Sequence, residues 1–100
     1  MTTWRGLISE EMRVHGETFD DVVSMCACTN NWKREDRQTF SDESWLDIEF
    51  DDSYGGTEGP LFTLWTQGRV YFPICYDGSE WVGSASREPD GKPMEHQGGG

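Results

Sequence analysis

Near the N-terminus, apolar residues recur with the spacing of an α-helix, and polar residues fill the positions between them. Apolar side chains recur at intervals of three and four, which predicts an amphipathic helix over residues 4–14 with an apolar stripe of Trp4, Leu7, Ile8 and Met12. Thr3 is a suitable N-cap, and Gly16 offers the left-handed residue that often follows a last turn. The pattern therefore fixes both ends of this helix.

A second helix is expected directly after Gly16. Thr18 and Asp21 have the spacing of a weak capping box, and the apolar side is formed by Phe19, Val22, Val23 and Cys26. The two predicted helices would form a hairpin. Residues 29–41 combine a mixed-charge run with few apolar side chains and are expected to be a surface connection.

Residues 45–51 alternate strictly, which predicts a half-buried strand. Its inner side would carry Leu46, Ile48 and Phe50, and its outer side Trp45, Asp47, Glu49 and Asp51. Residues 52–60 have the glycine and proline density of a loop.

From residue 61 the pattern predicts a β-meander with strands near 61–65, 70–76 and 81–85, separated by Gln67-Gly68 and Asp77-Gly78. Two-residue turns would pair Thr66 with Arg69 and Tyr76 with Ser79. One sheet face then carries Leu61, Trp65, Val70, Phe72, Ile74, Tyr76 and Trp81, and the other carries Phe62, Leu64, Tyr71, Pro73, Cys75 and Val82. We expect the first face to meet the helices, and Pro73 to cause a bend or bulge.

Together these elements predict an α+β fold, with an N-terminal two-helix hairpin packed on an antiparallel sheet of about four strands. A single domain would span residues 1–90, and residues 91–100 would form a flexible, Gly-rich tail.

Charge and composition narrow the functional classes. Nineteen Asp and Glu against eight Lys and Arg give a net charge of -11, which opposes direct binding to nucleic acid. No apolar run approaches the roughly 20 residues of a membrane span, and the first residues lack a signal-peptide pattern. Three cysteines is an odd count for a disulfide framework. We therefore expect a cytoplasmic protein that does not bind membranes.

Metal and catalytic motifs are weak. Cys26, Cys28 and Cys75 with two histidines do not match zinc-ligand spacing, so small buried hydrophobic residues are the favoured interpretation. The acids at 47–52 lack the pattern of a calcium loop. No nucleophile elbow or phosphate-binding loop is present in the sequence. We therefore expect no metal, no cofactor and no enzymatic activity.

Charge segregation is the clearest functional signal. Between Arg37 and Arg69 there is no Lys or Arg, yet seven acids lie there. On a strand, Asp47, Glu49 and Asp51 would repeat every ~6.8 Å, about twice the ~3.4 Å phosphate rise of one DNA strand. The acidic face would then imitate a phosphate track. The alternative is that these acids only keep the protein soluble and prevent edge-to-edge aggregation.

Part of the sequence also resembles known proteins. The segments that carry the resemblance include Tyr54-Gly55-Gly56-Thr57-Glu58-Gly59-Pro60, Arg69-Val70-Tyr71-Phe72-Pro73 and Tyr76-Asp77-Gly78-Ser79-Glu80-Trp81-Val82-Gly83-Ser84. They look like small uncharacterised proteins of bacteriophages and prophages, and cover roughly the C-terminal half. In size and acidity the chain is similar to anti-CRISPR proteins, a class that shares no common fold. The resemblance implies a bacterial host cell as the setting.

The expected function is that of a non-enzymatic phage or mobile-element inhibitor, which binds a CRISPR effector complex and blocks its target DNA binding. The partner would offer a basic nucleic-acid groove to a surface formed by Asp42, Glu43, Trp45, Asp47, Glu49, Asp51, Asp52, Tyr54 and Glu58, with Trp32 as a further possible anchor. The alternative is a phage structural or accessory module that binds a neighbouring subunit through the second apolar sheet face.

Overall fold

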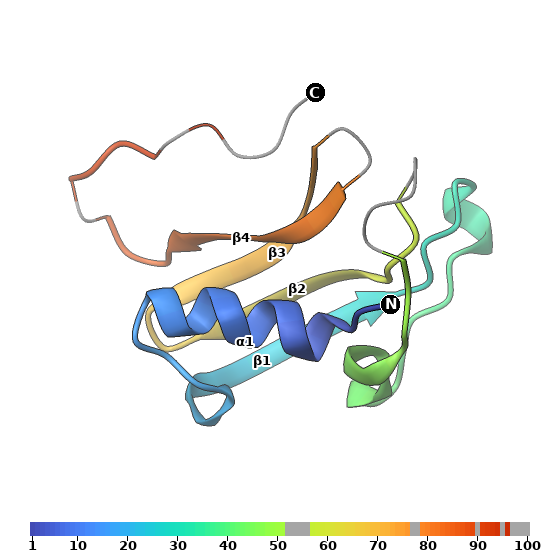
Figure 1. Ribbon diagram of the computed structural model, residues 1–100, viewed down its shortest axis with the longest axis horizontal. Coiled ribbons are helices and arrows are strands. Elements are labelled where there is room, and N and C mark those ends of the chain that lie inside the picture. Colours follow the sequence, from blue (N-terminus) through green and yellow to red (C-terminus); the bar gives the residue numbers. More distant parts are fainter. Residues whose placement is uncertain (52–56, 77–78, 90, 95, 97–100) are drawn as a thin grey trace.

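The computed structural model describes residues 1–51, 57–76, 79–89, 91–94 and 96. Its architecture is α+β, with helix α1 (Trp4–Val14) lying across one face of a four-stranded antiparallel sheet (Figure 1). The sheet contains β1 (Val22–Cys28), β2 (Leu61–Thr66), β3 (Arg69–Tyr76) and β4 (Ser79–Ser86), which neighbour one another in chain order. The predicted α+β class and the antiparallel sheet are confirmed.

Helix α1 begins and ends where the sequence predicts. The Thr3 hydroxyl accepts a hydrogen bond from the Gly6 backbone N–H at 3.2 Å, and Gly16 has a φ of 71°. Trp4, Ile8 and Met12 are fully buried, so the apolar stripe is the surface that meets the sheet.

The predicted second helix is wrong. Thr18 and Asp21 do form a capping box, in which the Asp21 carboxylate accepts from the Thr18 N–H at 2.9 Å. The box caps only a single 3-10 turn, η1 (Phe19–Asp21), after which the chain extends into β1. Val22 and Val23 are β-branched and favour the extended backbone, and pairing with β2 satisfies its polar groups. The described residues therefore contain one α-helix rather than a helical hairpin.

The predicted strand over residues 45–51 is also wrong. Asp42 accepts a hydrogen bond from the Ser44 N–H at 2.9 Å and starts a 3-10 helix, η3 (Glu43–Asp47). Successive side chains of a 3-10 helix are about 120° apart, whereas those of a strand point to opposite faces, so Trp45 and Leu46 can both be buried. Phe50 is buried as expected, whereas Ile48 is 40% exposed.

The register of the meander is confirmed, but its faces are inverted. Tyr76 faces Ser79, and Trp65 faces Val70, as two-residue turns require. The core cluster on the α1 side, however, takes its sheet residues from the face predicted to be free, namely Ala27, Phe62, Leu64, Tyr71 and Val82. The face with Leu61, Trp65 and Trp81 points away from the core. The second face, on which the alternative function relies, therefore has Phe62, Leu64, Tyr71 and Val82 buried in the core.

Aromatic rings form the centre of the core. The Trp4 ring centroid lies 4.8 Å from that of Phe50 and 4.9 Å from that of Phe62, and Trp45 stacks on Phe62 at 5.2 Å. A methyl group at Gly59 would come within 2.9 Å of Trp4 and Phe50 ring carbons. Only glycine therefore allows the loop before β2 to lie against these rings.

Strand β3 pairs differently with its two neighbours. Its register with β4 runs through Pro73 opposite Val82 without a shift, so the expected bulge is absent from this described pair. The described pairs between β2 and β3 are Leu64 with Tyr71 and Trp65 with Val70. Pro73 lies beyond them, so its missing N–H interrupts no ladder bond toward β2.

Candidate binding surfaces

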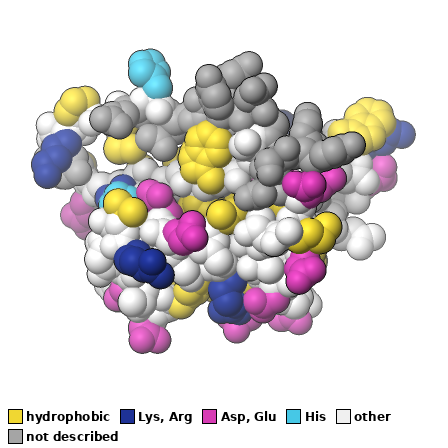
Figure 2. All heavy atoms as spheres, in the orientation of Figure 1, with side chains coloured by type: hydrophobic (Ala, Val, Ile, Leu, Met, Phe, Trp, Pro, Cys, Tyr) yellow, Lys and Arg dark blue, Asp and Glu magenta, His cyan; other side chains and the backbone are white. Residues whose placement is uncertain are grey.

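Six carboxylates gather around the N-terminus of α1, and we call this region the acidic end. Two contacts hold it there: Phe50 exchanges backbone hydrogen bonds of 2.9 Å with Thr2, and the Asp51 N–H donates to the Glu58 carboxylate at 3.2 Å. Figure 2 shows acidic side chains along the rim beside α1 and η3. The acidic end comprises Asp42, Glu43, Asp47, Glu49, Asp51 and Glu58.

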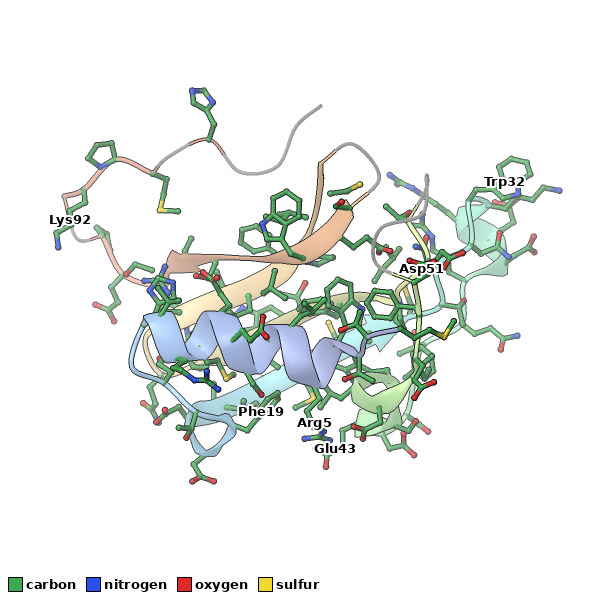
Figure 3. The ribbon with its side chains drawn as sticks, in the orientation of Figure 1. Arg5, Phe19, Trp32, Glu43, Asp51 and Lys92 are labelled. Atoms are coloured by element: carbon green, nitrogen blue, oxygen red, sulfur yellow. The ribbon has the colours of Figure 1, made fainter. Side chains whose placement is uncertain are left out.

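Arg5 forms an ion pair at the acidic end. Its guanidinium donates to both carboxylate oxygens of Asp47, at 2.7 and 3.1 Å, and Glu43 lies beside it (Figure 3). The hydrogen bond from Arg5 lowers the pKa of Asp47, and hydrogen bonds from Ser44 lower the pKa of Asp42. Both carboxylates are therefore fully ionised at neutral pH, which keeps this end negative.

The structure corrects the predicted site in two respects. The acids lie on a 3-10 turn and its flanking segments, so the regular strand track of Asp47, Glu49 and Asp51 does not exist. Trp45 is 1% exposed and cannot act as an anchor for a partner. Asp52 and Tyr54 lie outside the described residues.

Trp32 is the most exposed of the tryptophans that the structure describes. It is 84% exposed at the tip of the connection after β1, beside the 3-10 turn η2 (Arg34–Asp36), and Figure 3 shows it far from the sheet. The Lys33 ammonium lies 5.1 Å from the centroid of its ring. Trp32 is therefore free to enter a pocket on another molecule.

The face of the sheet opposite α1 carries a large apolar surface, which we call the open face. Its large side chains are all partly exposed, and none belongs to the core cluster among the described residues. Direct cross-strand pairs place them together, since Trp65 faces Val70 and Ile74 faces Trp81. The large apolar side chains of the open face are Leu61, Trp65, Val70, Phe72, Ile74 and Trp81.

Two cysteines also lie on the open face. On a helix, Cys26 and Cys28 would point in different directions, because residues two apart do not share a helix face. On β1 they point the same way, and Cys26 is paired with Thr63 of the open face. They line a hollow of about 310 Å³ with Leu61 and Thr63. Among the described residues no three metal-ligating side chains come together.

A polar network connects the end of α1 to the sheet. The Glu17 carboxylate accepts hydrogen bonds from the Tyr71 hydroxyl at 2.5 Å and from the Thr66 hydroxyl at 2.9 and 2.8 Å. Tyr71 and Thr66 are fully buried. Sequence reasoning missed this network because polar strand residues were taken to mark the exposed face.

A neighbouring cluster contains the residue types of a hydrolytic triad. The His15 Nε2 lies 3.2 Å from the Ser84 hydroxyl and 3.0 Å from the Glu11 carboxylate. In a triad the serine and the acid contact opposite nitrogens of the imidazole, whereas here both contact Nε2. Arg69 also donates two hydrogen bonds to the Ser84 oxygen, at 3.1 and 3.0 Å. This geometry provides no proton relay.

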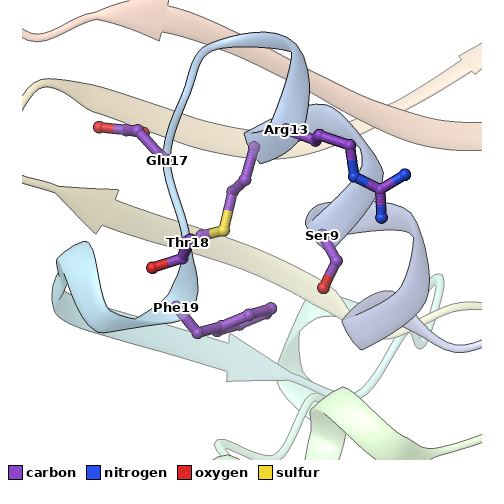
Figure 4. A pocket seen from close by; sticks show the side chains of 6 residues that line it. Ser9, Arg13, Glu17, Thr18 and Phe19 are labelled. Atoms are coloured by element: carbon purple, nitrogen blue, oxygen red, sulfur yellow. The ribbon is translucent and has the colours of Figure 1, made fainter.

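A small hollow lies between α1 and η1 (Figure 4). Met12 and Phe19 supply its apolar lining, and Ser9 and Arg13 approach it from α1. Its volume of about 240 Å³ is below the roughly 300–1,000 Å³ of ordinary ligand pockets. The Glu17 carboxylate is already engaged by Thr66 and Tyr71, so the hollow offers little for a ligand to bind.

Comparison with protein families, curated proteins and solved structures finds no match. The function has to be inferred from the residues of this chain and their geometry. No described helix is both long enough and apolar enough to span a bilayer.

The Tyr71 hydroxyl predicts a stability change at high pH. Burial, followed by its hydrogen bond to Glu17, raises the pKa of Tyr71 above the ordinary value of 10.0. Below pH 10, Tyr71 is protonated in both the folded and the unfolded protein. Above pH 10, the unfolded chain loses this proton while the folded protein keeps it. The free energy of unfolding should then fall with pH, by up to about 1.4 kcal/mol per unit. Guanidinium unfolding between about pH 9 and 11 would measure the slope.

Tyr71→Phe is the control for this slope, because it removes the titrating group and keeps the ring. Subtracting the two curves cancels the titration of the other tyrosines and lysines. Parallel curves for the two proteins would contradict the role assigned to the Tyr71 hydroxyl.

Glu80 fastens the loop before β2 to the start of β4. It is 4% exposed, and its carboxylate accepts from the backbone N–H groups of Glu58 at 2.8 Å and Gly59 at 3.1 Å. Asn30 donates to the Gly59 carbonyl at 3.0 Å from the other side. These bonds fix Glu58, and with it one margin of the acidic end.

Proposed function

We propose that this protein inhibits a host nucleic-acid-binding complex, of which a CRISPR effector is the leading example, by occupying its basic groove without catalysis. The acidic end carries the proposal, because it groups six carboxylates, of which Asp47 forms an ion pair with Arg5. Lys and Arg side chains that normally hold phosphates would bind these carboxylates instead. The inhibitor would act by competition with the nucleic acid.

The charge distribution supports recognition at long range. With a net charge of -11, the protein is attracted to a basic groove before contact, over a screening length of about 8 Å at physiological salt. Asp42, Glu43 and Glu49 are exposed, so they reach a partner without prior rearrangement. This type of attraction mainly raises the association rate.

The arrangement of the acids favours a compact basic patch as the binding surface. A regular phosphate track would require a strand, but these carboxylates project from η3 and the segments that pack against the start of α1. The partner should therefore present several Lys or Arg side chains close together. Trp32 is an exposed aromatic side chain that can add contact area beyond this patch.

The test replaces two exposed acids whose side chains form no hydrogen bond among the described residues. Glu43→Lys with Glu49→Lys changes two exposed carboxylates, while Asp47 is kept because it pairs with Arg5. We expect wild-type protein to prevent labelled duplex DNA from binding purified single-protein or multi-subunit CRISPR effectors. The double variant should need at least about tenfold more protein for the same effect, a loss of about 1.4 kcal/mol in binding.

A matched control separates local charge from net charge. Glu10→Lys with Glu88→Lys also reverses two exposed acids, away from the acidic end, and alters the net charge equally. This control should inhibit nearly as well as wild type. If both double variants lose the same activity, or if wild type blocks none of the effectors, the acidic end serves only solubility and the proposal is wrong.

A further inference from the structure

The open face lacks charged side chains, although 27% of the residues in the chain are charged. The cross-strand pairs on this face join Trp65 with Val70 and Phe72 with Gly83, and every described strand residue that points to it is uncharged. The charged strand residues Arg69 and Glu80 both point to the α1 side, where they have hydrogen-bond partners. A contiguous apolar patch of this kind marks an interaction site.

The open face borders the acidic end. Cys26, which lies on the open face at the edge strand β1, shares a hollow of about 370 Å³ with Asp42 and Glu43. An apolar centre with a charged margin is the usual anatomy of a protein interface. The two surfaces are therefore placed to act as parts of one interface.

We infer that the open face docks onto an apolar patch of the basic partner, next to the Lys and Arg side chains that bind the acidic end. This inference rests on the proposed function, because it takes the same partner. Charge complementarity favours a basic protein over the two other candidates for this surface, a second copy of the chain and a lipid membrane. A second copy of the chain would bring another net charge of -11, and an anionic lipid surface would repel Asp42 and Glu43.

The acidic end and the open face are expected to affect different rate constants of binding. Charged groups at a margin chiefly change the association rate and its salt dependence. Desolvated aromatic side chains, such as Trp65 and Trp81, chiefly slow dissociation. The acidic end would bring the partner close, and the open face would hold it.

The experiment uses a synthetic amphipathic helical peptide of leucine and lysine as the probe, since it combines an apolar stripe with positive charge. Two control peptides replace either all lysines by glutamate or all leucines by glutamine. We expect the leucine-lysine peptide to bind wild-type protein at least about tenfold more tightly than either control, because it alone matches both surfaces.

A pair of substitutions at Val70 tests the docking surface. If the open face binds the apolar stripe, both Val70→Glu and Val70→Arg should speed peptide dissociation about tenfold. If only charge matters, Val70→Glu should strengthen binding, which would overturn the inference. Val14→Glu and Val14→Arg are matched controls, because Val14 is 75% exposed on α1, and they should leave dissociation unchanged.

A second pair, Thr63→Glu and Thr63→Arg, replaces a side chain of the open face that is already polar, and should give the same result if the Val70 variants fail to fold. Peptide binding that is lost in the Glu43 and Glu49 double variant but kept in all open-face variants would overturn this inference while leaving the proposed function intact. A wild-type dimer in sedimentation that Val70→Arg converts to monomer would show a second copy as the occupant and overturn it as well.

Discussion

Replacing Trp4 with alanine is expected to lower the free energy of unfolding by about 3–5 kcal/mol, a large share of the stability of a domain this size. Trp4 is fully buried and its ring contacts both Phe50 and Phe62. Its indole N–H also donates to the Pro60 carbonyl at 2.9 Å. Alanine would leave a cavity and remove the donor that holds the loop before β2.

Chemical denaturation of wild type and variant measures this loss directly. Trp32→Ala is the matched control, since it removes the same side chain from a position that is 84% exposed, and should change stability by no more than about 0.5 kcal/mol. Equal losses at the two positions would contradict the assignment of Trp4 to the centre of the core.

The second large effect is expected at Glu17. Glu17→Ala removes the acceptor of the buried Tyr71 hydroxyl and the nearer acceptor of the buried Thr66 hydroxyl, which also lies 3.3 Å from the Arg69 carbonyl oxygen. We therefore expect a loss of about 1–3 kcal/mol in the free energy of unfolding, mainly from the unsatisfied Tyr71 hydroxyl. The loss arises from buried polar groups, although Glu17 itself is only half-buried.

Glu17→Gln separates hydrogen bonding from charge, because glutamine keeps an acceptor oxygen in the same place. Its loss in denaturant unfolding should be smaller than that of Glu17→Ala. If Glu17→Ala proved as stable as wild type, the two hydroxyls would have other acceptors and the network would not connect α1 to the sheet.

Local signals in the sequence predicted the elements that depend on local interactions. The cap at Thr3, the stop at Gly16 and the two-residue turns of the meander are each determined by a few neighbouring residues, and the helix and the strand register follow from them. The capping box at Thr18 was also correct as a local feature. It could not reveal that the chain would leave the turn for the edge of β2.

The choice of sheet face could not be derived in this way. Counting apolar residues favoured the face with Trp65 and Phe72, but the covered face also contains Thr66, Ser84 and Glu80, which looked like surface positions. Their partners, among them Glu17 and Gly59, are distant in the sequence. Those polar groups can be buried because they form hydrogen bonds with residues that are distant in the sequence, and the spacing of apolar residues does not reveal such bonds.

At the candidate site the acids Asp42, Glu43, Asp47 and Glu49 are exposed, as expected, but the strand geometry predicted for Asp47 and Glu49 is wrong. Alternation over residues 45–51 indicates a strand, but the Asp42 cap starts a 3-10 helix over Glu43–Asp47 that the alternation does not reveal. On a strand, Trp45 would lie on the outer side. On the 3-10 helix it lies in the core, where it stacks on Phe62.

The described pairing of β2 with β3 ends at Leu64 and Tyr71, and β3 continues beyond this point paired with β4. In this part of the sheet the Glu80 carboxylate links β4 to the loop before β2 by accepting hydrogen bonds from two backbone N–H groups of that loop. Loss of this carboxylate would therefore loosen the loop from β4 without removing any hydrogen bond of the sheet ladder.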